Sequence, residues 1–244
     1  VDSTITFDID GNYAAKTEDV YDDAGHTVAT INYTWIDGVK IGADYTLYTY
    51  TNNKITQETV YTWDAATQAY IGLQRTTYTF DASGVETLQL IEQWDTEMAD
   101  WIYSEKYEYE YDASHRMLRS EYAVLDMTVY DWVSQSKQLW TYDAAGHTLT
   151  NIILQVNATT LTLDSVRLYR NAYDSANRLV EEAYYGSYAD GWIGSWNRIW
   201  EYDAQGNVLN QEEYAGWENN DWKGKSKTTS TYDSAGNVLC RISY

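Results

Sequence analysis

Polar and apolar residues alternate with a period of two along much of the chain, in runs of about ten residues separated by short polar turns. In one such run Lys223, Lys225, Lys227 and Thr229 occupy every second position. This alternation is typical of half-buried antiparallel strands. The turns contain Gly, Asn and Asp, as in Asp37-Gly38, which favours tight β-hairpins. The pattern therefore predicts an all-β fold built from hairpins.

The predicted hairpins recur with a period of about 30 residues. Each unit carries a Tyr-Asp anchor or a near equivalent, and successive anchors lie 29 to 31 residues apart. The anchors are Tyr21-Asp22, Tyr50-Thr51, Phe80-Asp81, Tyr111-Asp112, Tyr142-Asp143, Tyr173-Asp174, Tyr202-Asp203 and Tyr232-Asp233. We expect about eight hairpin units in a single domain, residues 1–244, forming an elongated, twisted and curled antiparallel β-meander with its aromatic face inward.

The second strand of each unit has an aromatic residue ten positions before the anchor, as in Trp192 and Tyr202. Ten is an even number, so this spacing predicts that both side chains, with Trp196 between them, point to one face of the strand. Small residues such as Gly72 and Gly194 stand two positions after the hairpin aromatic. We expect them to line a shallow groove between rows of aromatic side chains.

Charge and composition exclude several classes of function. The chain has 16 basic and 37 acidic residues, a formal net charge of −21, which opposes binding to nucleic acid. A single cysteine, Cys240, excludes an internal disulfide and a cysteine-based zinc site, and we expect it to be a buried small apolar residue. No apolar run reaches the roughly 18 residues of a membrane-spanning helix. We predict no cofactor.

The anchor turns at 202–207 and 232–237, which read Tyr-Asp-x-x-Gly-Asn, resemble the YD-type repeats of bacterial surface and toxin-shell proteins, the Rhs-like group. The period near 30 and an added aromatic hairpin, as at Asp221-Trp222, depart from that pattern. The aromatic hairpins also resemble glucan- and choline-binding repeats of bacterial cell surfaces, and the Tyr-Asp-rich repeats of exported Bacteroidetes proteins. These resemblances imply a cell-surface or extracellular protein, released after removal of an export signal, and no particular chemistry.

Individual candidates for catalysis or metal binding are weak. His26 and His147 follow the anchor Asp by four residues and His115 by three, and we expect all three to fill turn positions at positive φ rather than to act as bases. Residues 7–12 open like a calcium loop but lack its remaining ligands, which favours a simple turn. The carboxylates form no unique constellation, so we predict no catalytic residues, no metal site and no enzyme activity.

The aromatic residues are the strongest candidates for function. Cross-strand pairs such as Trp217 with Trp222 can clamp each hairpin. An exposed aromatic patch can also bind a ligand, and Trp192, Trp196, Trp217 and Trp222 form the densest cluster in the sequence.

We therefore predict a non-enzymatic surface or secreted repeat protein that acts in adhesion or scaffolding. The alternative is a glycan-binding module that uses Trp and Tyr platforms, and a third hypothesis is an enzyme with an unrecognised carboxylate pair. The expected partner is a surface glycan or a protein ligand. Open sheet edges would also permit self-association.

Overall fold

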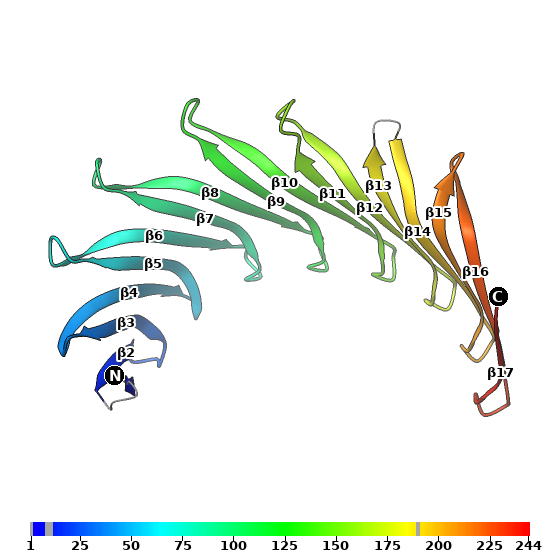
Figure 1. The fold of residues 1–244 in the computed structure, drawn as a ribbon, viewed down its shortest axis with the longest axis horizontal. Helices are drawn as coiled ribbons and strands as arrows, with labels where there is room; N and C mark the ends of the chain where they lie inside the picture. The colour runs from blue at the N-terminus through cyan, green and yellow to red at the C-terminus, as the bar shows by residue number, and fades with distance from the viewer. Residues whose placement is uncertain (1, 8–11, 189–190) are drawn as a thin grey trace. The chain divides into compact units, whose positions relative to one another are not determined.

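The computed structural model describes residues 2–7, 12–188 and 191–244, and its regular elements are all β-strands joined by short turns (Figure 1). The strands are β1 (Asp2–Phe7), β2 (Tyr13–Tyr21), β3 (Thr27–Ile36), β4 (Val39–Thr51), β5 (Lys54–Asp64), β6 (Ala69–Phe80), β7 (Glu86–Asp95), β8 (Asp100–Tyr111), β9 (Met117–Asp126), β10 (Asp131–Tyr142), β11 (Thr148–Val156), β12 (Leu163–Tyr173), β13 (Leu179–Tyr188), β14 (Gly191–Tyr202), β15 (Val208–Glu218), β16 (Asp221–Tyr232) and β17 (Val238–Ser243). The all-β prediction is confirmed.

Consecutive strands pair antiparallel, so the chain forms an open meander of 17 strands. Its contacts group into two compact units, Val1–Tyr109 with Tyr122–Val133, and Glu110–Glu121 with Ser134–Tyr244. In the first unit β1 to β7 follow one another in chain order, and in the second unit β11 to β17 do the same. That the whole chain is a single domain stays a prediction.

A β-bulge follows each anchor turn that the registers cover. In the β14–β15 pair, Glu201 lies opposite Asn210 and Tyr202 opposite Val208, which leaves Leu209 as the extra residue. The equivalent extra residues are Val28, Leu149, Val180 and Leu239. The residue six positions after the anchor aspartate is therefore the bulged residue. It is apolar in these five strand pairs and is Thr87 in the β6–β7 pair, and a bulge increases the local twist of the strands.

A second bulge shows that the predicted single aromatic face is wrong. In β14, Gly194 pairs with Tyr185 but Trp196 pairs with Tyr184, so Ser195 is an extra residue. Because one extra residue inverts the alternation of side chains, Gly194 and Trp196 point to opposite faces although two positions apart. Leu73 in β6 and Ser104 in β8 are the equivalent extra residues.

Few side chains are fully buried, because a single-layered sheet leaves both faces open. Among the described residues the buried apolar side chains are Ala29, Ile91, Ala123 and Ala183. The rest of the packing comes from half-buried rings and aliphatic stems. In β17, the last strand, every residue is exposed, so the prediction of a buried Cys240 is wrong.

Candidate functional site

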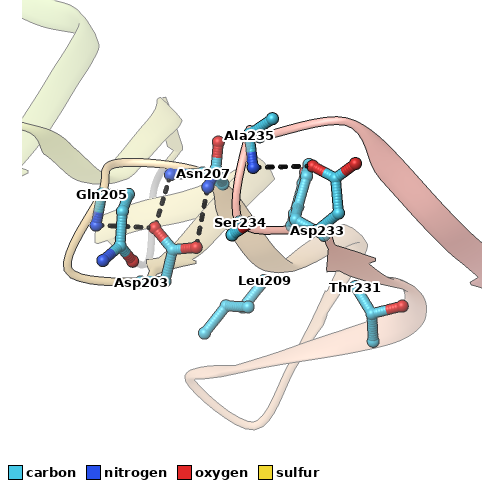
Figure 2. A pocket seen from close by; sticks show the side chains of 10 residues that line it. Asp203, Gln205, Asn207, Leu209, Thr231, Asp233, Ser234 and Ala235 are labelled. Carbon is cyan, nitrogen blue, oxygen red and sulfur yellow. Dashed lines mark hydrogen bonds between the residues drawn. The ribbon is translucent and has the colours of Figure 1, made fainter.

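Each anchor aspartate shapes the turn that follows it. Asp203 Oδ1 accepts hydrogen bonds from the backbone N–H groups of Gln205 and Asn207 at 3.0 and 2.8 Å, and Oδ2 accepts one from the Asn207 side-chain amide at 2.8 Å (Figure 2). Gly206 completes the turn at φ +94°, a conformation that glycine adopts without strain. The bond from the backbone N–H four residues on recurs at Asp22, Asp81, Asp112, Asp143, Asp174 and Asp233.

These hydrogen bonds lower the pKa values of six turn aspartates, Asp22, Asp112, Asp143, Asp174, Asp203 and Asp233. The Asn207 side-chain amide is the main cause at Asp203, and the imidazole of His147 is the main cause at Asp143. A general acid that works at neutral pH needs a raised pKa instead. These aspartates are therefore ionised hydrogen-bond acceptors.

The pKa of one carboxyl group shifts in the opposite direction. Burial raises the pKa of Glu86, which lies with Tyr50, Tyr78 and Phe80 around an open hollow in the first unit. A general acid needs such a raised pKa, so Glu86 is the carboxyl group that best fits the enzyme hypothesis.

The hydroxyl groups of four anchor tyrosines tie their repeats to the ones before them. Tyr202 donates to the backbone carbonyl of Leu179 at 2.8 Å, and Tyr232 donates to that of Val208 at 2.9 Å. Each acceptor is the residue six positions after the tyrosine of the preceding anchor. The same bond joins Tyr50 to Thr27 and Tyr142 to Met117.

The fourth residue after the anchor aspartate makes a second contact between repeats. The guanidinium of Arg178 lies 4.8 Å from the centroid of the Tyr202 ring, and its Nη1 donates to the backbone carbonyl of Asp203 at 2.7 Å. His147 stacks on Tyr173 with centroids 4.5 Å apart. We refer to the residues that stack in this way on an anchor tyrosine as the covering residues; they are His26, Arg116, His147 and Arg178.

This geometry corrects the interpretation of two histidines. Positive φ values belong to Gly25 and Gly146, and not to His26 and His147, which instead bond their own anchor aspartate and cover the next tyrosine. The expectation for His115 is confirmed, because its φ is +59°. Sequence reasoning missed the covering residues; the signal was the recurrence of His or Arg at one position of the turn.

The fourth position after Asp203 holds a shorter side chain, Asn207, as the position after Asp81 holds Val85. Asn207 bonds Asp203 as the longer residues bond their own aspartates, and its side chain ends with Oδ1 3.5 Å from where a Cβ at Gly236 would stand. An open hollow of about 650 Å³ remains between the Asp203 and Asp233 turns (Figure 2). Its lining includes Gln205, Leu209, Thr231, Tyr232 and Ser234.

At the hairpin-tip end, the aromatic pairs of three hairpins lie on a glycine of the neighbouring hairpin, Gly42, Gly72 or Gly194. Trp217 and Trp222 pair across β15 and β16 with ring centroids 4.7 Å apart and planes at 78°. A Cβ at Gly194 would lie 2.4 Å from Trp222 and 2.5 Å from Trp217. Tyr185 packs against both rings, at 5.8 and 5.5 Å.

The first unit repeats this arrangement. A Cβ at Gly72 would lie 2.9 Å from both Trp94 and Trp101, and one at Gly42 would lie 2.8 Å from Trp63. The glycines admit the rings of the next hairpin, because any larger side chain would occupy the same space. The groove predicted at Gly72 and Gly194 is therefore wrong, since aromatic rings fill that space.

The structure does not bring the four predicted tryptophans together. Trp217 and Trp222 are in contact, but Trp196 lies on the opposite face of the sheet because of the bulge in β14. There its ring contacts Tyr184, at 6.2 Å between centroids, and Arg198, whose guanidinium lies 5.2 Å from the ring centroid.

Trp192 lies at a separate place, beside an open hollow at the hairpin tips of the second unit. Tyr188 lines the same hollow and is 65% exposed. The polar residues of the lining are Asn157, Asp164, Ser165 and Ser187. A ring flanked by hydroxyl, amide and carboxylate groups offers both apolar contact and hydrogen bonds.

Two structural features, a metal-holding group and a membrane-spanning helix, are absent from the described part of the chain. No group of three or more His, Cys, Asp or Glu side chains in residues 2–7, 12–188 and 191–244 is arranged to hold a metal ion. Residues 8–11 of the calcium-like segment lie outside the described residues. Over the same described ranges there is no helix long and apolar enough to cross a membrane.

Comparison with known proteins gives structural likenesses only. No protein-family model matches the chain, and no curated protein matches it. A protein of unknown function from Bacteroides fragilis is 18% identical, with a TM-score of 0.41 over 51% of this chain and 91% of its own. A DUF3836 family protein from Parabacteroides distasonis is 17% identical, with a TM-score of 0.32 over 45% of this chain and 89% of its own.

A third likeness extends along almost the whole chain. The structure of TcdB2-TccC3-Cdc42 matches 98% of this chain at 14% identity, with a TM-score of 0.44, but only 13% of that much longer chain is covered. The neighbours thus include all-β proteins from Bacteroides and its relatives, and no YD-repeat family is confirmed. At these identities and scores the likenesses assign no activity.

Proposed function

We propose that this chain is a non-enzymatic repeat module of a bacterial surface or secreted protein of the YD-repeat type, and that it acts in adhesion or scaffolding. The observation that carries the proposal is at the hairpin tips. Tyr130 and Leu161 are 73% and 71% exposed, and both have positive φ, +54° and +56°. For a bulky residue this conformation costs roughly 1 kcal/mol.

Neither packing nor backbone geometry explains these two side chains. The two tips are built alike, because the N–H of Tyr130 donates to the carbonyl of Asp126 and that of Leu161 to Asn157, both at 2.8 Å. Glycine or asparagine would fit the same backbone with less strain. Exposed apolar side chains held on a strained turn are typical of a contact surface.

Other tips also carry exposed apolar residues. In the first unit Met98 is 61% exposed and Val39 62%, and in the second unit Tyr188 is 65% exposed; Val129, next to Tyr130 in the same tip, is 66% exposed. Exposed apolar side chains suit contacts with proteins, and an aromatic ring such as that of Tyr188 is also rigid. The turn aspartates and the covering residues, in contrast, make hydrogen bonds and stacking contacts within the fold.

The alternative is a glycan-binding module, and the hollow beside Trp192 favours it. An exposed tip tyrosine, Tyr188, and several polar groups surround that ring. Because Trp217 and Trp222 pack on Gly194, substitution at Trp222 would disturb the fold, whereas Trp192 can be changed at an open surface. Trp192→Ala is therefore the informative variant for this alternative.

The test compares tip variants for binding to arrays of extracellular proteins and of glycans. We expect saturable binding to a protein ligand that Tyr130→Asn and Leu161→Asn together weaken at least tenfold. Ala99→Asn is the matched control, since Ala99 also has a positive φ, +53°, but has a small side chain. It should leave binding unchanged.

Two outcomes would overturn the proposal. Glycan binding that Trp192→Ala abolishes, with the tip variants unaffected, would establish the glycan-binding alternative. Turnover of a substrate that Glu86→Gln abolishes without unfolding would establish an enzyme.

A further inference from the structure

We propose that the hollow between the Asp203 and Asp233 turns binds the guanidinium group of an arginine side chain presented by a partner protein. The site does not rest on the exposed tip residues described above. It lies at the anchor end of the second unit, and the occupant is indicated by what fills the equivalent space elsewhere in the same unit.

The preceding repeat shows the occupied form of the site. There Arg178 stacks on Tyr202 at 4.8 Å and donates from Nη1 to the carbonyl of Asp203 at 2.7 Å. That carbonyl also accepts the N–H of Gly206 at 3.1 Å, so it takes two hydrogen bonds at once. Arg116 does the same between Tyr142 and the carbonyl of Asp143.

Between the Asp203 and Asp233 turns, the tyrosine ring and the backbone carbonyl that would contact a guanidinium are both present. The shorter Asn207 stands where four other repeats have a covering residue. Tyr232 keeps its hydroxyl bond to Val208 at 2.9 Å, so its ring is held as the Tyr202 ring is held. The carbonyl of Asp233 accepts the N–H of Gly236 at 3.0 Å, which leaves its second lone pair for another donor. The Asn207 amide donates to Asp203, and its Oδ1 lies 3.5 Å from where a Cβ at Gly236 would stand. An amide oxygen only accepts, so Asn207 Oδ1 cannot donate to the Asp233 carbonyl as Arg178 Nη1 donates to that of Asp203.

Charge favours the same occupant. The carboxylates of Asp203 and Asp233 have lowered pKa values, caused mainly by Asn207 and Asn237, and stay ionised on either side of the hollow. The whole chain carries a net charge of −21, which attracts cations. A planar guanidinium combines the stacking, the hydrogen bond and the positive charge, whereas a lysine ammonium lacks the planar face.

The test is a titration of the 244-residue chain with three capped tripeptides, Gly-Arg-Gly, Gly-Lys-Gly and Gly-citrulline-Gly, followed by amide chemical shifts in NMR. We expect shifts at the Asn207 side-chain amide, Asp233 and Gly236. The arginine peptide should bind about tenfold more tightly than either of the others. Equal binding of all three peptides would overturn the proposal.

The second experiment uses variants that place a longer, stacking side chain at position 207. Asn207→Arg should occupy the hollow from within and abolish peptide binding. Asn207→His, which copies the stacking of His147 on its tyrosine, should do so if the arginine variant folds poorly. Asn237→Arg is the matched control, since it places the same side chain one turn later. Unchanged peptide binding in folded Asn207→Arg or Asn207→His, or its loss in Asn237→Arg alone, would contradict the assignment.

Discussion

At the anchor end of a repeat the contacts are polar and directional, whereas at the hairpin tip they are apolar and depend on shape. Asp203 shapes its turn through three hydrogen bonds, and Tyr202 reaches back to Leu179 through one more. At the tip, the rings of Trp217 and Trp222 fill the space that a side chain at Gly194 would need. Both ends connect neighbouring hairpins, but by different physical means.

The difference explains where the repeats are free to vary. The anchor end needs particular donors and acceptors, so the Tyr-Asp pair recurs along the chain. The paired rings at a tip need only a glycine that leaves them space, and the turn residues beyond them are free to vary, as Met98, Tyr130 and Leu161 show. Exceptions to each pattern are therefore the informative positions, as with Asn207 at the anchor end.

The largest expected effect is at the tip. Gly194→Ala places a methyl group within 2.6 Å of both tryptophans and should lower the free energy of unfolding by about 2–3 kcal/mol through overpacking. Gly216→Ala is the matched control, because its nearest neighbour lies at 3.4 Å, and it should change stability by less than about 0.5 kcal/mol. Equal destabilisation of the two variants by urea denaturation would contradict the packing described at Gly194.

Acid should act at the anchor ends and on the ion pairs between strands. Six turn aspartates have lowered pKa values, and hydrogen bonding from Lys225 lowers the pKa of Glu212 from 4.5 to about 2. A carboxyl group with a lowered folded-state pKa stabilises the fold fully above its unfolded value, and the effect is lost as pH falls through the folded value. We expect the melting temperature to fall between pH 4.5 and 2, and the fall to be smaller in Glu212→Gln.

A smaller effect is expected from one bond at the anchor end. Tyr202→Phe removes the hydroxyl that donates to Leu179 and should cost about 1 kcal/mol of unfolding free energy. Tyr130→Phe, at a side chain that is 73% exposed, is the control and should have no measurable effect. Identical midpoints in chemical denaturation for Tyr202→Phe and the wild type would show that the hydroxyl bond does not stabilise the repeat.

The smallest effect has the opposite sign. Leu161→Asn relieves a bulky residue from φ +56° and should raise the free energy of unfolding by about 0.5–1 kcal/mol. A gain in melting temperature together with weaker ligand binding would show that the exposed leucine serves binding at the expense of stability. A loss of stability would show that Leu161 packs in solution.

Much of the fold was predictable from the sequence, because the 30-residue period and the alternation of polar and apolar residues are local signals. The bulges at Ser195 and Leu73 were not, since a bulge depends on the pairing register of two strands and leaves no mark in a count of residues. The groove predicted at Gly194 was wrong because the rings of Trp217 and Trp222 fill it, and which rings face Gly194 also depends on how the strands pair.

Some features of the candidate sites were predictable from the sequence and others were not. Trp217 with Trp222 was foreseen as a cross-strand pair and is confirmed. The hollow beside Asn207 could not be foreseen, because it depends on how far a side chain reaches from one turn to the next. The strained tips likewise require backbone angles, which the identities of Tyr130 and Leu161 do not disclose.

The coupling of neighbouring repeats depends on a covering residue and an anchor tyrosine. A double-mutant cycle on Arg178→Ala and Tyr202→Leu, measured by urea denaturation, tests it directly. Stacking with a hydrogen bond to the adjacent turn predicts a coupling free energy of about 1 kcal/mol or more between Arg178 and Tyr202. Effects that add within about 0.3 kcal/mol would contradict this dependence.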